Sequence, residues 1–174
     1  SADNTKLSGL LVLNDKSLVH EYINLNRLIY TNNTIAKVFH NKILFLSERI
    51  AQSYVKSFSP DFLFITGGTN LQHNIPDFGN LYLLDAPFIL LGLYFLFAHK
   101  QKYRWLLLFW ILLAPVGASL TKDAPHSARS FAMFPGISIV TAYGVYYSYL
   151  QIKELWIRRL FGSLILIFYG MSLA

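Results

Sequence analysis

The stretch Ser130–Ile152, SFAMFPGISIVTAYGVYYSYLQI, is the longest part of the chain without a charged residue and runs for 23 residues between Arg129 and Lys153. An α-helix rises about 1.5 Å per residue, so roughly 17–25 apolar residues cross the hydrocarbon core of a bilayer. Glycine, proline and aromatic residues inside such a stretch are more typical of membrane helices than of soluble ones. The stretch therefore predicts a membrane-spanning helix.

Three further stretches support the same prediction. Trp105–Thr121 is free of charge, Leu160–Ala174 is free of charge up to the last residue, and Asn80–Ala98 carries only Asp85. We therefore expect an all-α, multi-span transmembrane protein with an N-terminal, partly helical extracytoplasmic region at 1–79. About four spans are expected, at 80–98, 105–121, 130–152 and 160–174. The first residue, Ser1, and the apolar end at Ala174 indicate the interior of a longer membrane protein.

Composition narrows the class of protein. Of the 174 residues, 54% are hydrophobic and 14% are charged, whereas a soluble domain carries about 25% charged residues. That shortfall argues against an ordinary cytosolic domain and against a disordered one. The net charge of +6 is concentrated in the apolar C-terminal half, which favours a bilayer over nucleic acid as the partner. The absence of cysteine excludes disulfides and thiolate metal sites.

The basic residues also predict an orientation. The short loops 99–104 and 151–159 each carry three Lys or Arg residues, and the loop 121–130 carries two. Positive loops stay on the cytoplasmic side. We therefore expect a multi-pass protein of the plasma (inner) membrane, with residues 1–79 and 121–130 extracytoplasmic.

The N-terminal region contains an amphipathic pattern. Apolar residues recur at three- and four-residue spacing from Ile43 to Phe58, which predicts a helix with one apolar face. This helix either lies on the outer leaflet or forms the core-facing helix of a small outer domain. Ser59-Pro60-Asp61 then ends the helix and starts a short new one with Ser59 as its cap, and Gly67-Gly68-Thr69-Asn70 predicts a turn.

The loop before the longest stretch is the strongest candidate for a binding site. Asp123 is a good N-cap and Pro125 suits a first helical turn, so we expect the next helix to begin here. A helix N-terminus beside Lys122, His126 and Arg129 has the chemistry of a phosphate site. Alternatively, the two cations contact lipid headgroups while His126 caps the helix or pairs with Asp123.

Two other places carry polar residues of interest. His73, with Asn70 and its amide neighbours, could hydrogen-bond a sugar or a headgroup, although a solvated loop explains it equally well. Asp85 is either functional or placed in the interfacial layer at little cost, and the second interpretation is favoured. The five histidines lack ligand spacing, so neither a metal nor another cofactor is expected.

Two parts of the sequence carry recognisable motifs. They are SPDFLF at 59–64, GGTNLQHN at 67–74 and PDFGNLY at 76–82 in the first part, and PVGASLTKDAPHSARS at 115–130 in the second. Together they resemble bacterial membrane glycosyltransferases related to the protein O-mannosyltransferases (glycosyltransferase family 39, GT-C fold), and the similarity runs from about Asn14 to Tyr146. The chain departs from the family pattern where Gly68 or Thr69 replaces an aspartate, Gln72 an arginine and Lys122 an arginine, the last of which loses the bidentate fork.

The resemblance implies a reaction and a set of roles. Such enzymes move a sugar from a polyprenyl-phosphate carrier to the hydroxyl of a protein, glycan or lipid acceptor. It implies that Lys122, His126 and Arg129 hold the donor phosphate. Asn70, His73 and Asp85 are candidates for a possible substrate loop on their residue types alone. No catalytic residue is assigned, because the catalytic carboxylate is expected upstream of Ser1, and the chain alone is expected to be inactive. The alternative is a non-catalytic membrane scaffold or a transporter subunit.

Overall fold

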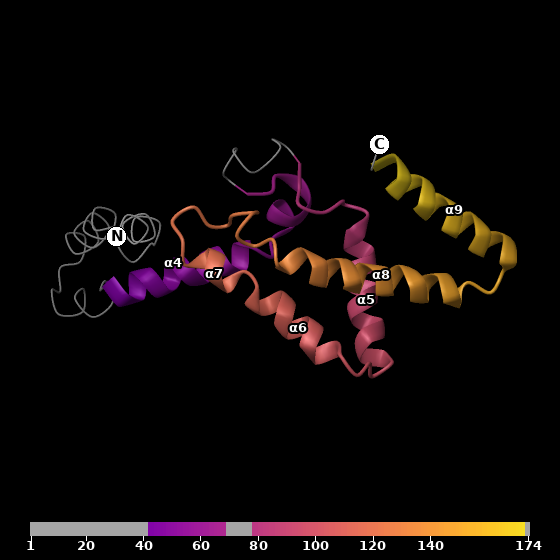
Figure 1. Ribbon diagram of the computed structural model, residues 1–174, viewed down its shortest axis with the longest axis horizontal. Coiled ribbons are helices and arrows are strands. Elements are labelled where there is room, and N and C mark those ends of the chain that lie inside the picture. The colour runs from indigo at the N-terminus through magenta and orange to yellow at the C-terminus, as the bar shows by residue number, and fades with distance from the viewer. Residues whose placement is uncertain (1–41, 69–77, 173–174) are drawn as a thin grey trace, which may run out of the picture. The chain divides into compact units, whose positions relative to one another are not determined.

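The computed structural model describes residues 42–68 and 78–172, and all of the regular structure in these ranges is helical. The all-α prediction is therefore confirmed for the described part of the chain (Figure 1). In chain order the elements are α4 (Lys42–Lys56), the π-helical turn η2 (Asp61–Ile65), α5 (Asp85–Ala98), α6 (Arg104–Leu113), α7 (Val116–Ser119), α8 (Met133–Gln151) and α9 (Leu155–Ser172).

The predicted membrane spans are not formed. Within the described residues, no helix combines the length and the apolar character that crossing a bilayer requires. The predicted four-span fold is therefore wrong, and so is the predicted multi-pass plasma-membrane location with residues 1–79 and 121–130 extracytoplasmic.

The failure has a physical reason in each stretch. The 14 residues of α5 extend for about 21 Å, well short of a hydrocarbon core of about 30 Å. The stretch 105–121 divides at Ala114-Pro115 into α6 and the four-residue α7. The longer α8 contains serine, threonine and several tyrosine residues, and α9 includes Arg158 and Arg159. The prediction of spans from stretches without charged residues did not take these helix interruptions and polar side chains into account.

The described residues divide into two compact units. Unit 1 includes residues 42–68, 78–81 and 112–133, and unit 2 includes residues 82–111 and 134–172. The candidate phosphate loop belongs to unit 1, whereas Asp85 belongs to unit 2.

In unit 1, α4 is the amphipathic helix that the sequence predicts. Leu46 and Ser53 are buried, as is Ser57 directly after the helix, and Ile50 and Tyr54 are half-buried. The helix packs against α7, so α4 is a core-facing helix of unit 1. Ile43, at the start of the predicted apolar face, is instead exposed.

The predicted break after α4 is present, and the short helix η2 follows it. The Phe62 backbone N–H donates to Ser59 Oγ at 3.2 Å. The N-cap position of η2 is occupied by Pro60, so the prediction that Ser59 is the cap residue is wrong. The returning segment satisfies carbonyl groups of this turn: Asn80 Nδ2 donates to the Phe62 oxygen and the Leu81 N–H donates to the Leu63 oxygen, both at 2.8 Å. A Cβ atom on Gly79 would lie 2.2 Å from the Phe64 carbonyl carbon, so this close approach requires glycine.

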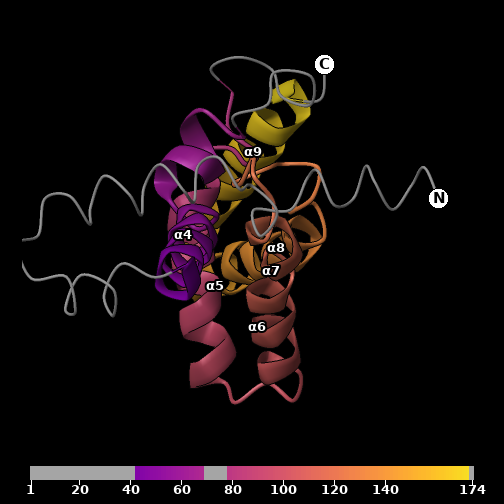
Figure 2. The ribbon, with the colours of Figure 1, turned by 90° about the vertical axis from the view of Figure 1, so that its left-hand side faces the viewer.

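Unit 2 depends on a second close approach, between α5 and α8. A Cβ atom on Gly92 would lie 2.0 Å from the Val140 carbonyl oxygen, and one on Gly144 would lie 2.0 Å from the Phe88 carbonyl oxygen. The two helices therefore cross with their backbones nearly in contact. The short connection 99–103 leads from α5 into α6 (Figure 2).

Candidate functional site

The loop between α7 and α8 does not form the helix N-terminus that the sequence predicts. Residues 120–132 make turns and bends, and α8 begins only at Met133. The expectation that Asp123 caps a helix with Pro125 in its first turn is therefore wrong. The residue types of a cap are present, but here the polar side chains stabilise the loop itself. Any anion bound at this loop would be held by side chains and loop amides.

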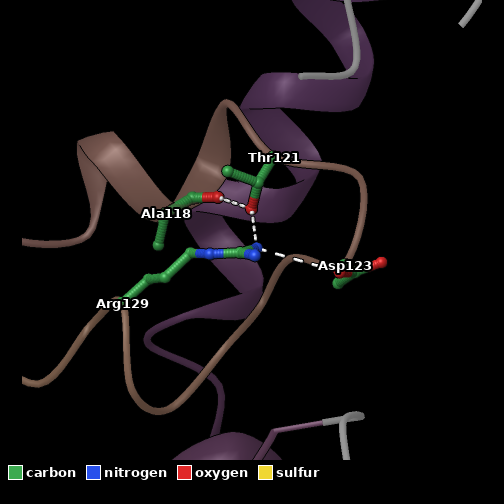
Figure 3. Close-up of polar contacts among 4 residues, drawn as sticks. All are labelled: Ala118, Thr121, Asp123 and Arg129. Atoms are coloured by element: carbon green, nitrogen blue, oxygen red, sulfur yellow. Dashed lines mark hydrogen bonds and ion pairs between the residues drawn. The ribbon is translucent and has the colours of Figure 1, made fainter. Parts of the chain in front are cut away.

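Arg129 is the organising residue of this loop (Figure 3). Its Nη1 donates to Thr121 Oγ1 at 2.8 Å and lies 3.8 Å from Asp123 Oδ2. The Thr121 hydroxyl in turn donates to the Ala118 carbonyl oxygen at 2.7 Å, which ties the loop to the end of α7. The Arg129 side chain is 29% exposed and that of Asp123 is 47% exposed, so the ion pair adds at most about 1 kcal/mol of stability.

A hydrogen bond links this loop to the Gly67-Gly68 pair that follows η2. The Gly68 backbone N–H donates to Ser127 Oγ at 3.0 Å, across 59 residues of sequence, and both groups are buried. Gly67 has a φ of 70°, a backbone conformation that favours glycine. Thr69 and Asn70 lie outside the described residues, so the turn predicted at 67–70 stays a prediction. The two segments that carry the family resemblance are thus in direct contact within unit 1.

The three predicted phosphate ligands differ in their surroundings. His126 is only 3% exposed, whereas Lys122 and Arg129 are half-buried. Of the charged side chains in residues 121–130, two are cationic and one, Asp123, is anionic, so the loop has a net charge of 2 − 1 = +1 with neutral histidine. The structure places all three residues on one loop of unit 1, and their role in binding phosphate stays a prediction.

The other predicted site residues do not join this loop. Asn70 and His73 lie outside the described residues. Asp85 is buried in the first turn of α5, where its Oδ2 accepts from the Tyr82 N–H at 3.0 Å and its Oδ1 accepts from the Tyr169 hydroxyl. The positive end of the helix dipole also stabilises a carboxylate at this position. Burial, followed by the hydrogen bond to Asp85, raises the pKa of Tyr169 above its ordinary value. Asp85 therefore stabilises unit 2.

Several contributing residues have no recognisable sequence signal. Ser127 contributes by accepting a hydrogen bond from the Gly68 N–H. Thr121 contributes by donating to the Ala118 oxygen and accepting from Arg129. Ser130 is fully buried, and its Oγ makes no hydrogen bond with any described residue. Such tertiary contacts of serine and threonine leave no periodicity or motif in the sequence.

In the described part of the chain, no group of three or more His, Cys, Asp or Glu residues could hold a metal ion. The functional chemistry of the loop therefore has to be inferred from Lys122, His126, Arg129 and the neighbouring hydroxyl groups. Comparison with known proteins adds no assignment, since no family model, no curated protein and no solved structure matches this chain.

Proposed function

We propose that the chain is part of a glycosyltransferase that takes a sugar from a polyprenyl-phosphate donor, and that the loop 121–130 binds the donor phosphate. The observation that carries this proposal is the position of Arg129, a half-buried guanidinium held by the Thr121 hydroxyl in a loop of net positive charge. The resemblance of the segments 59–82 and 115–130 to this enzyme family supports it.

The geometry of Arg129 suits a phosphate ligand. A guanidinium has five N–H donors, and the contacts with Thr121 and Asp123 both use Nη1. The donors on Nε and Nη2 are not used by these two contacts and match the spacing of two phosphate oxygens. A side chain that is already fixed also loses little conformational freedom when it binds its ligand.

The reaction requires such a group. When the sugar leaves its carrier, negative charge develops on the departing phosphate, and a preorganised cation lowers the energy of that transition state. Lys122 supplies a second charge as a flexible ammonium, and the buried imidazole of His126 can donate a hydrogen bond. The base that activates the acceptor hydroxyl is not assigned to a described residue, because the Asp85 carboxylate is already hydrogen-bonded within unit 2.

The proposal is tested by calorimetric titration of the chain with geranyl phosphate, a short prenyl phosphate, alongside geraniol and inorganic phosphate. We expect geranyl phosphate to bind, geraniol to bind at least 10-fold more weakly, and Lys122→Ala to weaken geranyl phosphate binding about 3- to 10-fold. Lys153→Ala, which removes an exposed lysine outside the loop, is the matched control and should change affinity less than 2-fold. Equal binding of geraniol and geranyl phosphate would contradict a phosphate site.

One observation favours a second function, a non-catalytic scaffold. Arg129 pairs with Asp123 and Asp85 bonds with Tyr169, so both charged groups have structural partners. A scaffold predicts that substitutions in the loop lower stability without changing the affinity for any phosphate compound. The same titrations, combined with thermal unfolding of each variant, separate the two functions.

A further inference from the structure

We propose that Ser127 is a further ligand of the donor phosphate, donating its hydroxyl hydrogen to a phosphate oxygen while its Oγ accepts the Gly68 N–H. This inference rests on the proposed function, because it concerns the same loop and the same ligand. The Ser127 hydroxyl would add a neutral hydrogen-bond donor to the cationic side chains of the site. The Gly68 N–H would then support phosphate binding indirectly, through its hydrogen bond to Ser127.

The existing hydrogen bond of Ser127 has a defined direction. Gly68 donates its backbone N–H to Ser127 Oγ at 3.0 Å, so the serine oxygen is the acceptor. A serine hydroxyl has one hydrogen to donate and two lone pairs. The Gly68 N–H occupies one of these lone pairs. Because the amide hydrogen is partially positive, it repels the hydroxyl hydrogen, which turns toward another acceptor.

Two other hydroxyl groups of the same region donate to backbone carbonyl oxygens. The Thr121 hydroxyl donates to the Ala118 oxygen and the Ser119 hydroxyl donates to the Val116 oxygen, both at 2.7 Å. Their hydrogens are therefore committed to backbone carbonyl groups. Ser127 differs because its described hydrogen bond uses the oxygen and leaves the hydrogen for a ligand.

The position of Ser127 in the loop also suits a ligand of the phosphate. Ser127 lies between His126 and Arg129 in one turn, which the Ser130 N–H closes by donating to the His126 oxygen at 3.0 Å. It is 9% exposed, so it lies at the boundary of the buried region, whereas the neighbouring Ser130 has no exposed surface. A hydrogen-bond donor so placed, polarised by an N–H group behind it, is a stronger donor toward an anion than an isolated hydroxyl.

The resulting chain of hydrogen bonds runs from the Gly68 N–H to the Ser127 oxygen and from the Ser127 hydrogen to the phosphate. Binding of the anion draws the hydroxyl hydrogen toward it, which makes the serine oxygen a better acceptor. The Gly68 amide should therefore report on a ligand that it does not touch.

The experiment measures the affinity for geranyl phosphate and the amide proton shift of Gly68 by two-dimensional ¹H–¹⁵N NMR. We expect Ser127→Ala to weaken binding about 10-fold, the loss expected for one hydrogen bond to a charged group. Ser127→Thr, which keeps the hydroxyl, should restore most of the affinity. Ser119→Ala, which removes a buried hydroxyl with a local partner, should stay within about 2-fold of the original chain. On addition of geranyl phosphate, the Gly68 amide proton should shift downfield in the unsubstituted chain and in Ser127→Thr.

The outcomes separate this inference from the proposed function. If Arg129→Ala loses affinity but Ser127→Ala binds as well as the unsubstituted chain, the role of Ser127 is refuted and the phosphate site stands. An unmoved Gly68 amide in a chain that binds geranyl phosphate refutes it as well. If the unsubstituted chain does not bind geranyl phosphate, the proposed function fails and this inference fails with it.

Discussion

The close approach of α5 and α8 gives a sharp prediction for Gly92→Ala. The added methyl group would lie 2.0 Å from the Val140 carbonyl oxygen, whereas a carbon and an oxygen in contact are normally about 3.3 Å or more apart. The obstacle is backbone inside α8, so no side-chain rotation can relieve it. The two helices must separate by more than about 1 Å at their crossing or tilt away from each other.

The magnitude follows from two opposing effects. Overpacking in a well-packed interior typically costs about 1–3 kcal/mol, and a backbone obstacle belongs at the upper end of that range. Replacing glycine by alanine inside a helix gains up to about 1 kcal/mol. The expected net loss in the free energy of unfolding is therefore about 2 kcal/mol. In a chain of this size, that corresponds to a decrease of about 4–8 °C in the midpoint of thermal unfolding.

The assay is thermal unfolding followed by circular dichroism at 222 nm. Gly170→Ala is the matched control, because it makes the same change inside α9 where a Cβ atom would have nothing within 4 Å. It should leave the midpoint unchanged or raise it slightly. Equal midpoints for Gly92→Ala and Gly170→Ala would refute the close crossing of α5 and α8.

The remaining predictions concern tyrosine residues of unit 2. Tyr169→Phe removes the hydroxyl that donates to the buried Asp85 carboxylate and should lower the free energy of unfolding by about 1.5–3 kcal/mol in urea unfolding, whereas Tyr103→Phe, at an exposed tyrosine, should change it by less than about 0.5 kcal/mol. Equal effects of the two substitutions would contradict the structural role assigned to Asp85. Burial, and then the neighbouring hydroxyl group of Tyr147, raise the pKa of Tyr143 to about 12 from its ordinary value of 10.0. The unfolded chain loses this proton first, so stability should fall as the pH rises from 10 to 12, and Tyr143→Phe should make that fall smaller, as followed by urea unfolding at each pH. An unchanged pH dependence in Tyr143→Phe would argue against the raised pKa.

Local patterns predicted local structure well. The spacing of apolar residues located α4, the sequence Ser59-Pro60-Asp61 located the break between α4 and η2, and the Gly67-Gly68 pair includes a glycine with positive φ. Each of these features depends on residues within a few positions of one another, so the sequence contains its signal. The apolar stretches also indicated where helices form, because α5, α6, α8 and α9 lie almost entirely within or beside them.

Predictions that depended on more than local pattern were less successful. The absence of charged residues identified the apolar stretches. It did not reveal that the helix is interrupted at Pro115 or that α9 includes Arg158 and Arg159. The cap residues at Asp123 and Pro125 indicated a helix start, yet the contact of Arg129 with Thr121 and Asp123 belongs to a loop instead. The bond between Gly68 and Ser127 joins groups 59 residues apart, and no spacing rule relates them.

The most direct test of the phosphate site compares Arg129→Ala with Arg159→Ala. Both substitutions remove one arginine, but Arg159 is exposed on α9 and lies outside the loop. The measured quantity is the dissociation constant for geranyl phosphate, determined by calorimetry at low salt with thermal unfolding of each variant alongside. We expect Arg129→Ala to weaken binding at least about 10-fold, as for loss of a charge-assisted contact, and Arg159→Ala to change it less than about 2-fold. Equal dissociation constants for the two variants would contradict the assignment of the loop 121–130 as the donor-phosphate site.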